Sequence, residues 1–223
     1  KVFIATGRPL GIINNIDGIL PFIDGYLTAN GAHCIVGNEV VYHQPILKAD
    51  VELILNEATK QDYSCVVVGQ DAIGTFNYKD NIDRIFRRML DIHGVDYNIP
   101  IEELLKTDIL ELTPFVSVQQ EQQLMPRIPN CVSARWHPEF MDVTSRLADK
   151  GRGLTAIAQH LGIALSDCVA FGDGGNDISM FVAAGIGVAM GNAGDNVKQA
   201  ANFVTKHIDE EGIMHAMKYL GIV

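Results

Sequence analysis

The chain has 223 residues, of which 48% are hydrophobic and 20% are charged, and its mean hydropathy is +0.13. This composition is typical of a globular protein, and no apolar run approaches the roughly 20 residues of a membrane-spanning helix. A net charge of −10 and a sequence pI of about 5.0 argue against a nucleic-acid partner, because binding a polyanion needs clustered lysine and arginine.

The beginning of the chain is expected to form short strands. Lys1–Ala5 is a continuous apolar stretch that predicts a strand, and Thr6-Gly7-Arg8-Pro9 ends it. Because proline suits the first turn of a helix, we expect a helix over residues 10–16. Further strands are predicted before the middle region, the last two forming a hairpin: residues 26–28, 34–36 and 40–42.

The middle of the chain, residues 47–144, is richer in patterns typical of antiparallel strands, which predicts an inserted α+β domain. Its expected helices cover residues 48–59, 81–93, 101–105 and 119–124. Its expected strands cover residues 65–68, 75–76, 109–113, 132–135 and 140–144.

From residue 145 the chain alternates between helices and wholly apolar strands. The expected helices cover residues 153–161, 178–184, 195–201 and 212–220, and the expected strands cover 169–171, 185–190 and 203–205. Strict alternation with apolar strands predicts a doubly wound parallel sheet. The predicted fold is therefore α/β, with a Rossmann-like core made by residues 1–46 and 145–223 and the α+β domain of residues 47–144 inserted into it.

The run Gly172-Asp173-Gly174-Gly175-Asn176-Asp177 lies between an apolar strand and a helix, and it is the most informative motif of the chain. Two carboxylates and an amide at the tip of a parallel strand suit a hard cation such as Mg²⁺, which prefers oxygen ligands. The glycines allow a sharp turn and a close approach to a ligand. The pattern predicts a cation site, and the alternative is an acidic surface turn that caps a helix.

Anion-binding groups follow from the same topology, because ligands gather at the carboxyl ends of the strands in a doubly wound sheet. The first loop offers the Thr6 hydroxyl with the backbone N–H groups of Gly7 and Arg8, and the next loop offers Asn30. Lys150 at the start of a helix opposes the helix dipole, which an anionic partner would rationalise. Taken alone, the first loop is better explained as a plain turn, and Lys150 is equally well a surface lysine. Together with the acidic loop they suggest phosphoryl transfer.

Four motifs, in order along the chain, resemble the haloacid dehalogenase superfamily: Ala5-Thr6-Gly7-Arg8-Pro9, Asn30-Gly31-Ala32, Lys150-Gly151 and the acidic loop at residues 172–177. The run Gly187-Val188-Ala189-Met190-Gly191-Asn192-Ala193 is similar to one branch of it, the Cof-type phosphatases with a large α+β cap domain, also called type IIB sugar phosphatases. The resemblance covers the whole chain. It implies a Mg²⁺-dependent phosphatase of small phosphomonoesters such as sugar phosphates, with residues 47–144 as the cap that selects the substrate.

The resemblance also implies roles for residues at matching positions. Thr6 would hydrogen-bond the transferring phosphoryl group and Lys150 would neutralise it, which makes these two the expected catalytic residues. Asp173 would ligate Mg²⁺, and Asp177 would complete the inner or outer shell of the metal. The substrate side would be lined by Gly7, Arg8, Asn30 and Asn176.

One departure from the family concerns its first motif, D-x-D-G-T, which carries the aspartate nucleophile and the aspartate acid/base. This motif is absent, and Asp17-Gly18 does not replace it because no buried strand precedes it. We expect the native protein to be longer and the nucleophile to lie upstream of Lys1. The sheet of the present chain would then lack a central strand, which exposes backbone donors and acceptors on both neighbouring strands.

Two other functions are compatible with parts of the sequence. A catalytically inactive member of the same fold would bind phosphate and metal without turnover. A nucleotide-dependent dehydrogenase is suggested by the glycines of residues 185–191, but these form a strand instead of following one, which disfavours a dinucleotide-binding loop. Trp136-His137-Pro138 could touch substrate, although a packed aromatic at a domain joint is favoured.

The four cysteines are far apart, form no C-x-x-C pair and lie in apolar contexts: Cys34, Cys65, Cys131 and Cys168. We therefore expect free thiols in a reducing cytoplasm. The expected partner is a small phosphorylated metabolite, with no nucleic acid and no membrane, and the expected assembly is a monomer or a small homo-oligomer.

Overall fold

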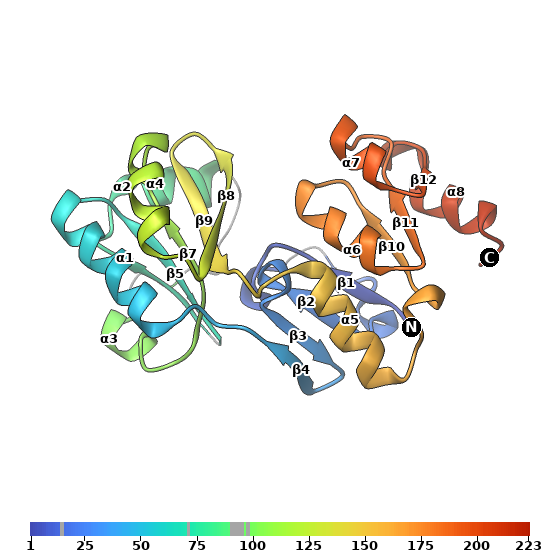
Figure 1. Cartoon of the computed structure of the whole chain (residues 1–223), viewed down its shortest axis with the longest axis horizontal. Coiled ribbons are helices and arrows are strands. Elements are labelled where there is room, and N and C mark those ends of the chain that lie inside the picture. Colours follow the sequence, from blue (N-terminus) through green and yellow to red (C-terminus); the bar gives the residue numbers. More distant parts are fainter. Residues whose placement is uncertain (14–15, 71, 90–95, 97–98) are drawn as a thin grey trace. The chain divides into compact units, whose positions relative to one another are not determined.

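The computed structural model describes residues 1–13, 16–70, 72–89, 96 and 99–223, and the chain divides into two compact units (Figure 1). Unit 1 comprises Lys1–Gly7, Asp24–Tyr42 and Asp149–Val223, and unit 2 comprises Arg8–Ile23 and His43–Ala148. Unit 2 contains all of residues 47–144, and it also includes three segments expected in the core: Arg8–Ile23 and residues 43–46 and 145–148. Within the described ranges, we find no helix with both the length and the apolar character needed to span a membrane.

The first sheet of unit 1 contains strands β1 (Phe3–Ala5), β2 (Gly25–Thr28), β3 (His33–Val36) and β4 (Glu39–His43), in this spatial order. β1 and β2 are parallel, whereas β2 and β3 are antiparallel, which makes this sheet mixed instead of wholly parallel. β3 and β4 are hydrogen-bonded neighbours joined by the two residues Gly37 and Asn38, so the predicted hairpin is confirmed.

The helix expected over residues 10–16 is wrong in its described part. Only one 3-10 turn forms, at Leu10–Ile12, and Ile13 is already extended, with φ −74° and ψ 123°. No side chain caps this turn, and Gly11 beside two β-branched isoleucines gives the segment low helix propensity. Residues 14 and 15 lie outside the described residues.

The second sheet of unit 1 contains the parallel strands β10 (Val169–Gly172), β11 (Ile186–Ala189) and β12 (Phe203–Val204). The helices of this part are α5 (Lys150–Leu161), α6 (Ile178–Ala183), α7 (Asp195–Ala200) and α8 (Gly212–Tyr219). They alternate with the strands as expected, and α5 lies against β2 and β3 (Figure 1).

One hydrophobic cluster joins the two sheets of unit 1. Leu27 and Cys34 from the first sheet are buried with Ile157 of α5, Phe181 of α6 and Ala189 of β11. The two sheets therefore share a single core, which fixes the strand ends of both sheets relative to one another within the unit.

β1 and β10 are the end strands of their sheets. Among the described residues, β1 pairs only with β2 and β10 pairs only with β11. All three residues of β1 are apolar yet only partly buried, and so are Val169 and Phe171 of β10. Strands in parallel sheets are ordinarily paired on both sides and buried on both faces, so each of these two strands leaves one edge open.

Unit 2 is built on a five-stranded antiparallel sheet in the order β6-β5-β7-β9-β8. Its strands are β5 (Cys65–Gly69), β6 (Ile73–Phe76), β7 (Ile109–Pro114), β8 (Cys131–His137) and β9 (Phe140–Ser145). Its helices are α1 (Lys48–Gln61), α2 (Asp80–Ile82), α3 (Ile101–Leu104) and α4 (Val118–Leu124). α2 continues as a π-helical segment over Asp83–Met89, and the end of the helix expected at 81–93 lies outside the described residues from residue 90.

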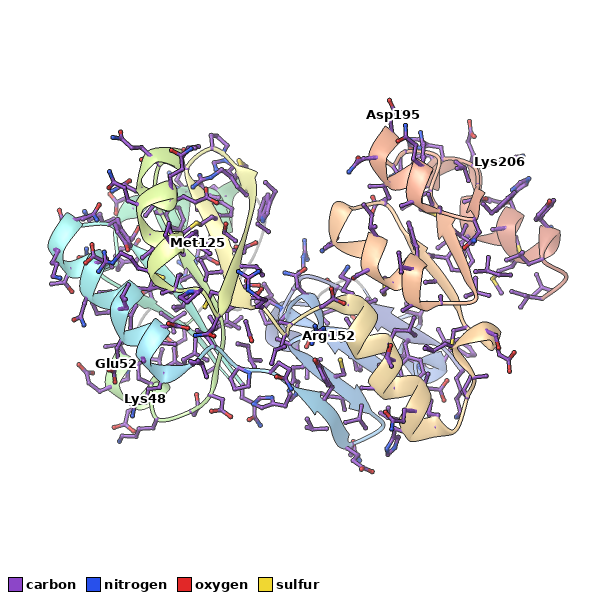
Figure 2. The ribbon with its side chains drawn as sticks, in the orientation of Figure 1. Lys48, Glu52, Met125, Arg152, Asp195 and Lys206 are labelled. Atoms are coloured by element: carbon purple, nitrogen blue, oxygen red, sulfur yellow. The ribbon has the colours of Figure 1, made fainter. Side chains whose placement is uncertain are left out.

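α1 covers one face of this sheet because its apolar residues recur at helical spacing. Val51, Ile54 and Ala58 are buried in the same cluster as strand residues of the sheet, whereas Lys48 and Glu52 project into solvent (Figure 2). Helices packed on an antiparallel sheet give unit 2 the α+β composition expected for the middle of the chain.

Candidate active site

The functional loops of unit 1 follow strands β1, β2 and β10, and they meet through hydrogen bonds. Thr6 follows β1 and donates its backbone N–H to Leu27 O at 2.8 Å, while Asn30 N donates to Thr6 O at 3.3 Å. Asn176 of the acidic loop then donates from Nδ2 to Asn30 Oδ1 at 2.8 Å. The three loops predicted to gather at the carboxyl ends of the strands are therefore connected to one another.

Asn30 owes its position to an unusual backbone conformation. Its φ of 55° and ψ of 28° lie in the left-handed region, which asparagine tolerates better than most residues. Gly7 packs against this side chain so closely that a Cβ at Gly7 would lie 3.0 Å from Asn30 Oδ1. A small residue at position 7 thus allows the first two loops to approach each other.

Lys150 forms a buried ion pair with Asp177. Lys150 Nζ lies 2.6 Å from Asp177 Oδ1, and the side chains are only 4% and 7% exposed. Asp177 Oδ2 accepts hydrogen bonds from the backbone N–H groups of Asp173 at 3.0 Å and Gly174 at 2.9 Å. Asp177 therefore closes the acidic loop with one oxygen and fixes the lysine with the other.

The start of α5 positions Lys150. Asp149 caps the helix by accepting a hydrogen bond from Arg152 N at 2.9 Å, so Lys150 is the first helical residue. Gly31 has a φ of +91° and lies so close to Asp149 that any Cβ would overlap the Asp149 carbonyl. On the other side, Gly151 N donates to Ser179 Oγ at 3.1 Å. Gly31 and Gly151 thus let the start of α5 fit between the second loop and the beginning of α6.

Asp173 is exposed, unlike Asp177. Its Oδ2 accepts a hydrogen bond from Asn192 Nδ2 at 3.1 Å, and Asn192 Oδ1 accepts from Ile208 N at 3.2 Å. Sequence reasoning did not assign Asn192 to the site. Its position just after β11, at the carboxyl end of another parallel strand, is the signal that could have identified it.

Among the described residues, the carboxylates near the acidic loop offer few ligands to a divalent cation. In the described residues, no group of three or more His, Cys, Asp or Glu side chains is placed to hold a metal. Asp173 nevertheless presents an exposed carboxylate, whereas both oxygens of Asp177 are engaged with Lys150 and the loop backbone. Mg²⁺ commonly binds through one or two carboxylates while keeping several waters and contacting substrate phosphate, so this set fits Mg²⁺ better than a metal needing an all-protein cage.

Unit 1 brings together seven of the eight site residues expected from the sequence: Thr6, Gly7, Asn30, Lys150, Asp173, Asn176 and Asp177. The eighth, Arg8, belongs to unit 2, and its part in the site stays a prediction. The structure places the seven in connected loops and at the start of α5.

The cysteine thiols are poor candidates for a nucleophile. All four are free, and three of them are buried. Burial raises the pKa of Cys34 to about 12 and that of Cys131 to about 12, so both stay protonated near neutral pH. The prediction of free thiols is confirmed.

Known proteins resemble this chain over nearly its whole length. Residues 1–217 match the profile of a family described as haloacid dehalogenase-like hydrolase. A solved haloacid dehalogenase subclass IIB sugar phosphatase is 41% identical, with a TM-score of 0.88 over 100% of this chain and 86% of that one. A phosphatase of the same superfamily from Bacteroides thetaiotaomicron, BT1666, is 31% identical, with a TM-score of 0.87 over 100% and 82%. The 5-amino-6-(5-phospho-D-ribitylamino)uracil phosphatase YcsE of Bacillus subtilis is 27% identical over 98% of this chain and 81% of its own length.

The chain belongs to the haloacid dehalogenase-like hydrolases. The resemblance derived from the motifs is confirmed, as is the α/β fold with a Rossmann-like core and an inserted α+β cap. The enzyme class, a hydrolase of phosphoric monoesters, is confirmed as well, which excludes the dehydrogenase alternative.

Proposed function

We propose that this protein is a Mg²⁺-dependent phosphatase that acts on small phosphomonoesters, in particular sugar phosphates. The observation that carries the proposal is the connection of the Thr6, Asn30 and acidic loops beside the buried Lys150–Asp177 pair. The loop geometry offers backbone N–H groups, amides and an ammonium group for an anion, next to the exposed carboxylate of Asp173 for a cation.

Lys150 and Thr6 act on the phosphoryl group in this proposal. The Thr6 hydroxyl donates a hydrogen bond to a phosphoryl oxygen, and the ammonium group of Lys150 offsets the negative charge that spreads over the transferring group. Asp177 holds Lys150 at 2.6 Å and so acts through it as a positioning residue. Asn176 and Asn30 fix each other and orient the substrate side, together with Gly7 and Arg8.

Asp173 is the direct protein ligand for Mg²⁺ in this proposal, with Asp177 in the outer shell. The metal would supply charge neutralisation for the phosphate when bound. Asn192 orients the Asp173 carboxylate through its 3.1 Å hydrogen bond, so we add Asn192 to the residues that position the metal ligand.

The nucleophile is proposed to be an aspartate on a strand upstream of Lys1. The open edges of β1 and β10 support this proposal, because both are parallel strands in one unit that share a core and are paired on one side only among the described residues. The aspartate attacks phosphorus, and the alcohol leaves with a proton that the second aspartate of the missing motif supplies. Water then hydrolyses the aspartyl phosphate and releases inorganic phosphate.

Sugar phosphates are proposed as substrates from the likeness to a sugar phosphatase, with 41% identity over the whole of this chain. The competing proposal is an inactive member of the fold that binds phosphate and metal. Phosphate release should be measured for a panel of phosphorylated metabolites, using full-length protein with and without Mg²⁺. Turnover of at least one sugar phosphate that EDTA abolishes supports the enzyme, whereas binding without release supports the inactive alternative.

A further inference from the structure

Trp136 is the only tryptophan of the chain and lies near the end of β8 in unit 2. The sequence favoured a packed aromatic here, but 56% of the residue is exposed. Large aromatic side chains in contact with water are frequent in binding sites, where they provide contact area with little loss of conformational freedom. Packing in a hydrophobic core therefore does not explain why a tryptophan stands at position 136.

The indole ring of Trp136 is fixed despite its exposure. Its Nε1 donates a hydrogen bond to Asp142 Oδ2 at 2.7 Å, across the β8–β9 hairpin. Its ring also packs edge to face with Phe140, with centroids 4.7 Å apart and an interplanar angle of 86°. Phe140 is itself fully buried, so the exposed ring has a rigid support.

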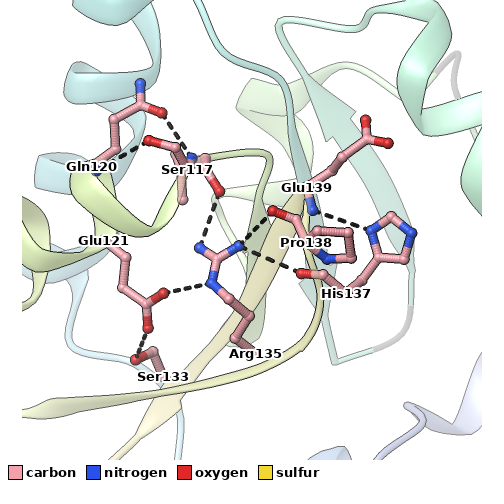
Figure 3. Close-up of polar contacts among 9 residues, drawn as sticks. Ser117, Gln120, Glu121, Ser133, Arg135, His137, Pro138 and Glu139 are labelled. Atoms are coloured by element: carbon pink, nitrogen blue, oxygen red, sulfur yellow. Dashed lines mark hydrogen bonds and ion pairs between the residues drawn. The ribbon is translucent and has the colours of Figure 1, made fainter.

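Arg135 holds the neighbouring backbone, as Figure 3 shows. Its Nε donates to Glu121 Oε2 at 2.7 Å, and two further nitrogens donate to Pro138 O at 3.1 Å and Val116 O at 3.0 Å. The guanidinium of Arg135 thus connects the turn of the β8–β9 hairpin to the beginning of α4 through hydrogen bonds. These hydrogen bonds fix the backbone around Trp136. A ligand that binds to the indole ring would therefore cause little further loss of conformational entropy in the protein.

Asp142 places a carboxylate beside the ring. Its Oδ1 accepts a hydrogen bond from Thr113 Oγ1 at 2.9 Å, and its Oδ2 accepts the indole N–H. Each carboxylate oxygen has two acceptor positions and accepts one hydrogen bond from the described residues, so each can accept a second from a ligand hydroxyl. Burial raises the pKa of Asp142, which indicates a site partly withdrawn from water, where hydrogen bonds are stronger.

Ala134 leaves space next to these groups. It pairs with Asp142 across the hairpin, so both side chains lie on the same face of the sheet, and it is exposed. Its methyl group is too small to cover the carboxylate. The face therefore combines an exposed indole, a carboxylate with free acceptor positions and a small neighbour.

We propose that Trp136, Asp142 and Ala134 form a binding site in unit 2 for the ring of a neutral polyhydroxylated compound, such as an unphosphorylated sugar. The C–H groups of a sugar ring pack on the indole face, and its hydroxyls donate to Asp142. An anion is disfavoured because the carboxylate of Asp142, which accepts the indole N–H, is the charged group beside the ring among the contacts of the described residues. The inference depends on the proposed function only for the choice of sugars as the ligand class.

The test uses the fluorescence of the single tryptophan. Full-length protein is titrated with tetroses, pentoses, hexoses and polyols without phosphate, and separately with inorganic phosphate. We expect a saturable change in Trp136 emission with at least one neutral compound and no change with inorganic phosphate. The site is overturned if no neutral compound changes the emission, or if inorganic phosphate alone does.

Two variants keep the reporter while altering the site. Asp142→Ala removes the acceptor, and Ala134→Leu fills the space beside the ring; each should lower affinity by at least about 10-fold, equivalent to about 1.4 kcal/mol. Ala134 is exposed, so Ala134→Leu preserves the fold even if Asp142→Ala does not. Wild-type affinity in folded Ala134→Leu would contradict the proposed site.

A matched control places the only tryptophan elsewhere. In Trp136→Phe/Tyr219→Trp the reporter moves to a residue of unit 1 that is 69% exposed, and its emission should not respond to the same compound. If the emission of the tryptophan at position 219 also changed, the change seen in the wild type would be explained by non-specific quenching. Sugar binding without phosphate release would refute the proposed function alone, and phosphate release without sugar binding would refute this inference alone.

Discussion

Asn176 Nδ2 donates a hydrogen bond to Asn30 Oδ1 at 2.8 Å, joining two loops whose residues are 146 positions apart in the chain. Asn30 in turn bonds to the backbone of Thr6. Asn30 therefore connects the loop after β1, in the first sheet, to the loop after β10, in the second sheet. These contacts hold together the groups proposed to bind the anion and the cation, although the residues lie far apart in the sequence.

The Lys150–Asp177 pair should be energetically coupled. Lys150→Met leaves the buried Asp177 carboxylate without its cation, and we expect a loss of about 3 kcal/mol in the free energy of unfolding. Asp177→Asn in the same chain removes the uncompensated charge and should restore at least about 1 kcal/mol. Urea unfolding of the two single variants and the double variant measures the coupling. Additive single effects would show that the ion pair contributes nothing specific.

Asp173 should control metal binding without controlling stability. Because the side chain of Asp173 is exposed and accepts a hydrogen bond from the equally exposed Asn192, Asp173→Asn should change the free energy of unfolding by less than about 0.5 kcal/mol. Calorimetric titration with Mg²⁺ in the presence of inorganic phosphate should lose its binding signal. Asp195→Asn, at an exposed position that starts α7, is the matched control and should bind Mg²⁺ as the wild type does. Equal Mg²⁺ affinity in both variants would remove Asp173 as the ligand.

Gly31 and Gly37 offer a matched comparison of two glycines with positive φ. At Gly31, with φ +91°, a Cβ would overlap the Asp149 carbonyl, whereas at Gly37, with φ +58°, a Cβ would meet nothing within 4 Å. Gly37→Ala should cost about 1 kcal/mol for the backbone conformation alone. Gly31→Ala should cost about 2–5 kcal/mol, because overpacking adds to the conformational strain. Thermal or urea unfolding measures both, and similar losses would mean that the contact with Asp149 relaxes freely.

Glu57 should make stability depend on acid pH. Hydrogen bonds from Arg127 and Gln61 lower the pKa of Glu57 from 4.5 to about 2. Because the folded-state pKa is depressed, the contribution of the carboxylate is full above the unfolded pKa of 4.5 and is lost as pH falls toward about 2. The difference in unfolding free energy between wild type and Glu57→Gln should therefore be largest near pH 7 and shrink below about pH 4.5. A pH-independent difference in urea unfolding experiments would contradict the assignment.

The sequence alone predicts the elements that have strong local patterns. The apolar strand at Val169–Gly172, the acidic loop after it and the helix beginning at Ile178 all appear as predicted, because strand, glycine turn and helix are each encoded within a few residues. The helix expected at residues 10–16 does not form in its described part, because the low helix propensity of Gly11 and the neighbouring β-branched residues outweighs the effect of the proline at its start.

Contacts between side chains that lie far apart in the sequence could not be predicted from one sequence alone. The ion pair of Lys150 with Asp177 depends on how the acidic loop closes, and the clamp of Arg135 on Glu121 depends on the register of a hairpin against a helix. Neither leaves a periodic signal in the sequence. Topology could have identified Asn192, since the rule that strand ends gather ligands applies to β11 as it does to β10.

The central proposal is that the protein hydrolyses phosphate esters, with Lys150 acting on the phosphoryl group and Asp173 binding Mg²⁺. Phosphate release by full-length protein tests it most directly. With a sugar phosphate and Mg²⁺ present, wild type should turn over, Lys150→Ala should lower the turnover number by at least about 100-fold, and Asp173→Asn should show no Mg²⁺-dependent release. Wild-type rates in both variants, with folding verified by circular dichroism, would contradict the account.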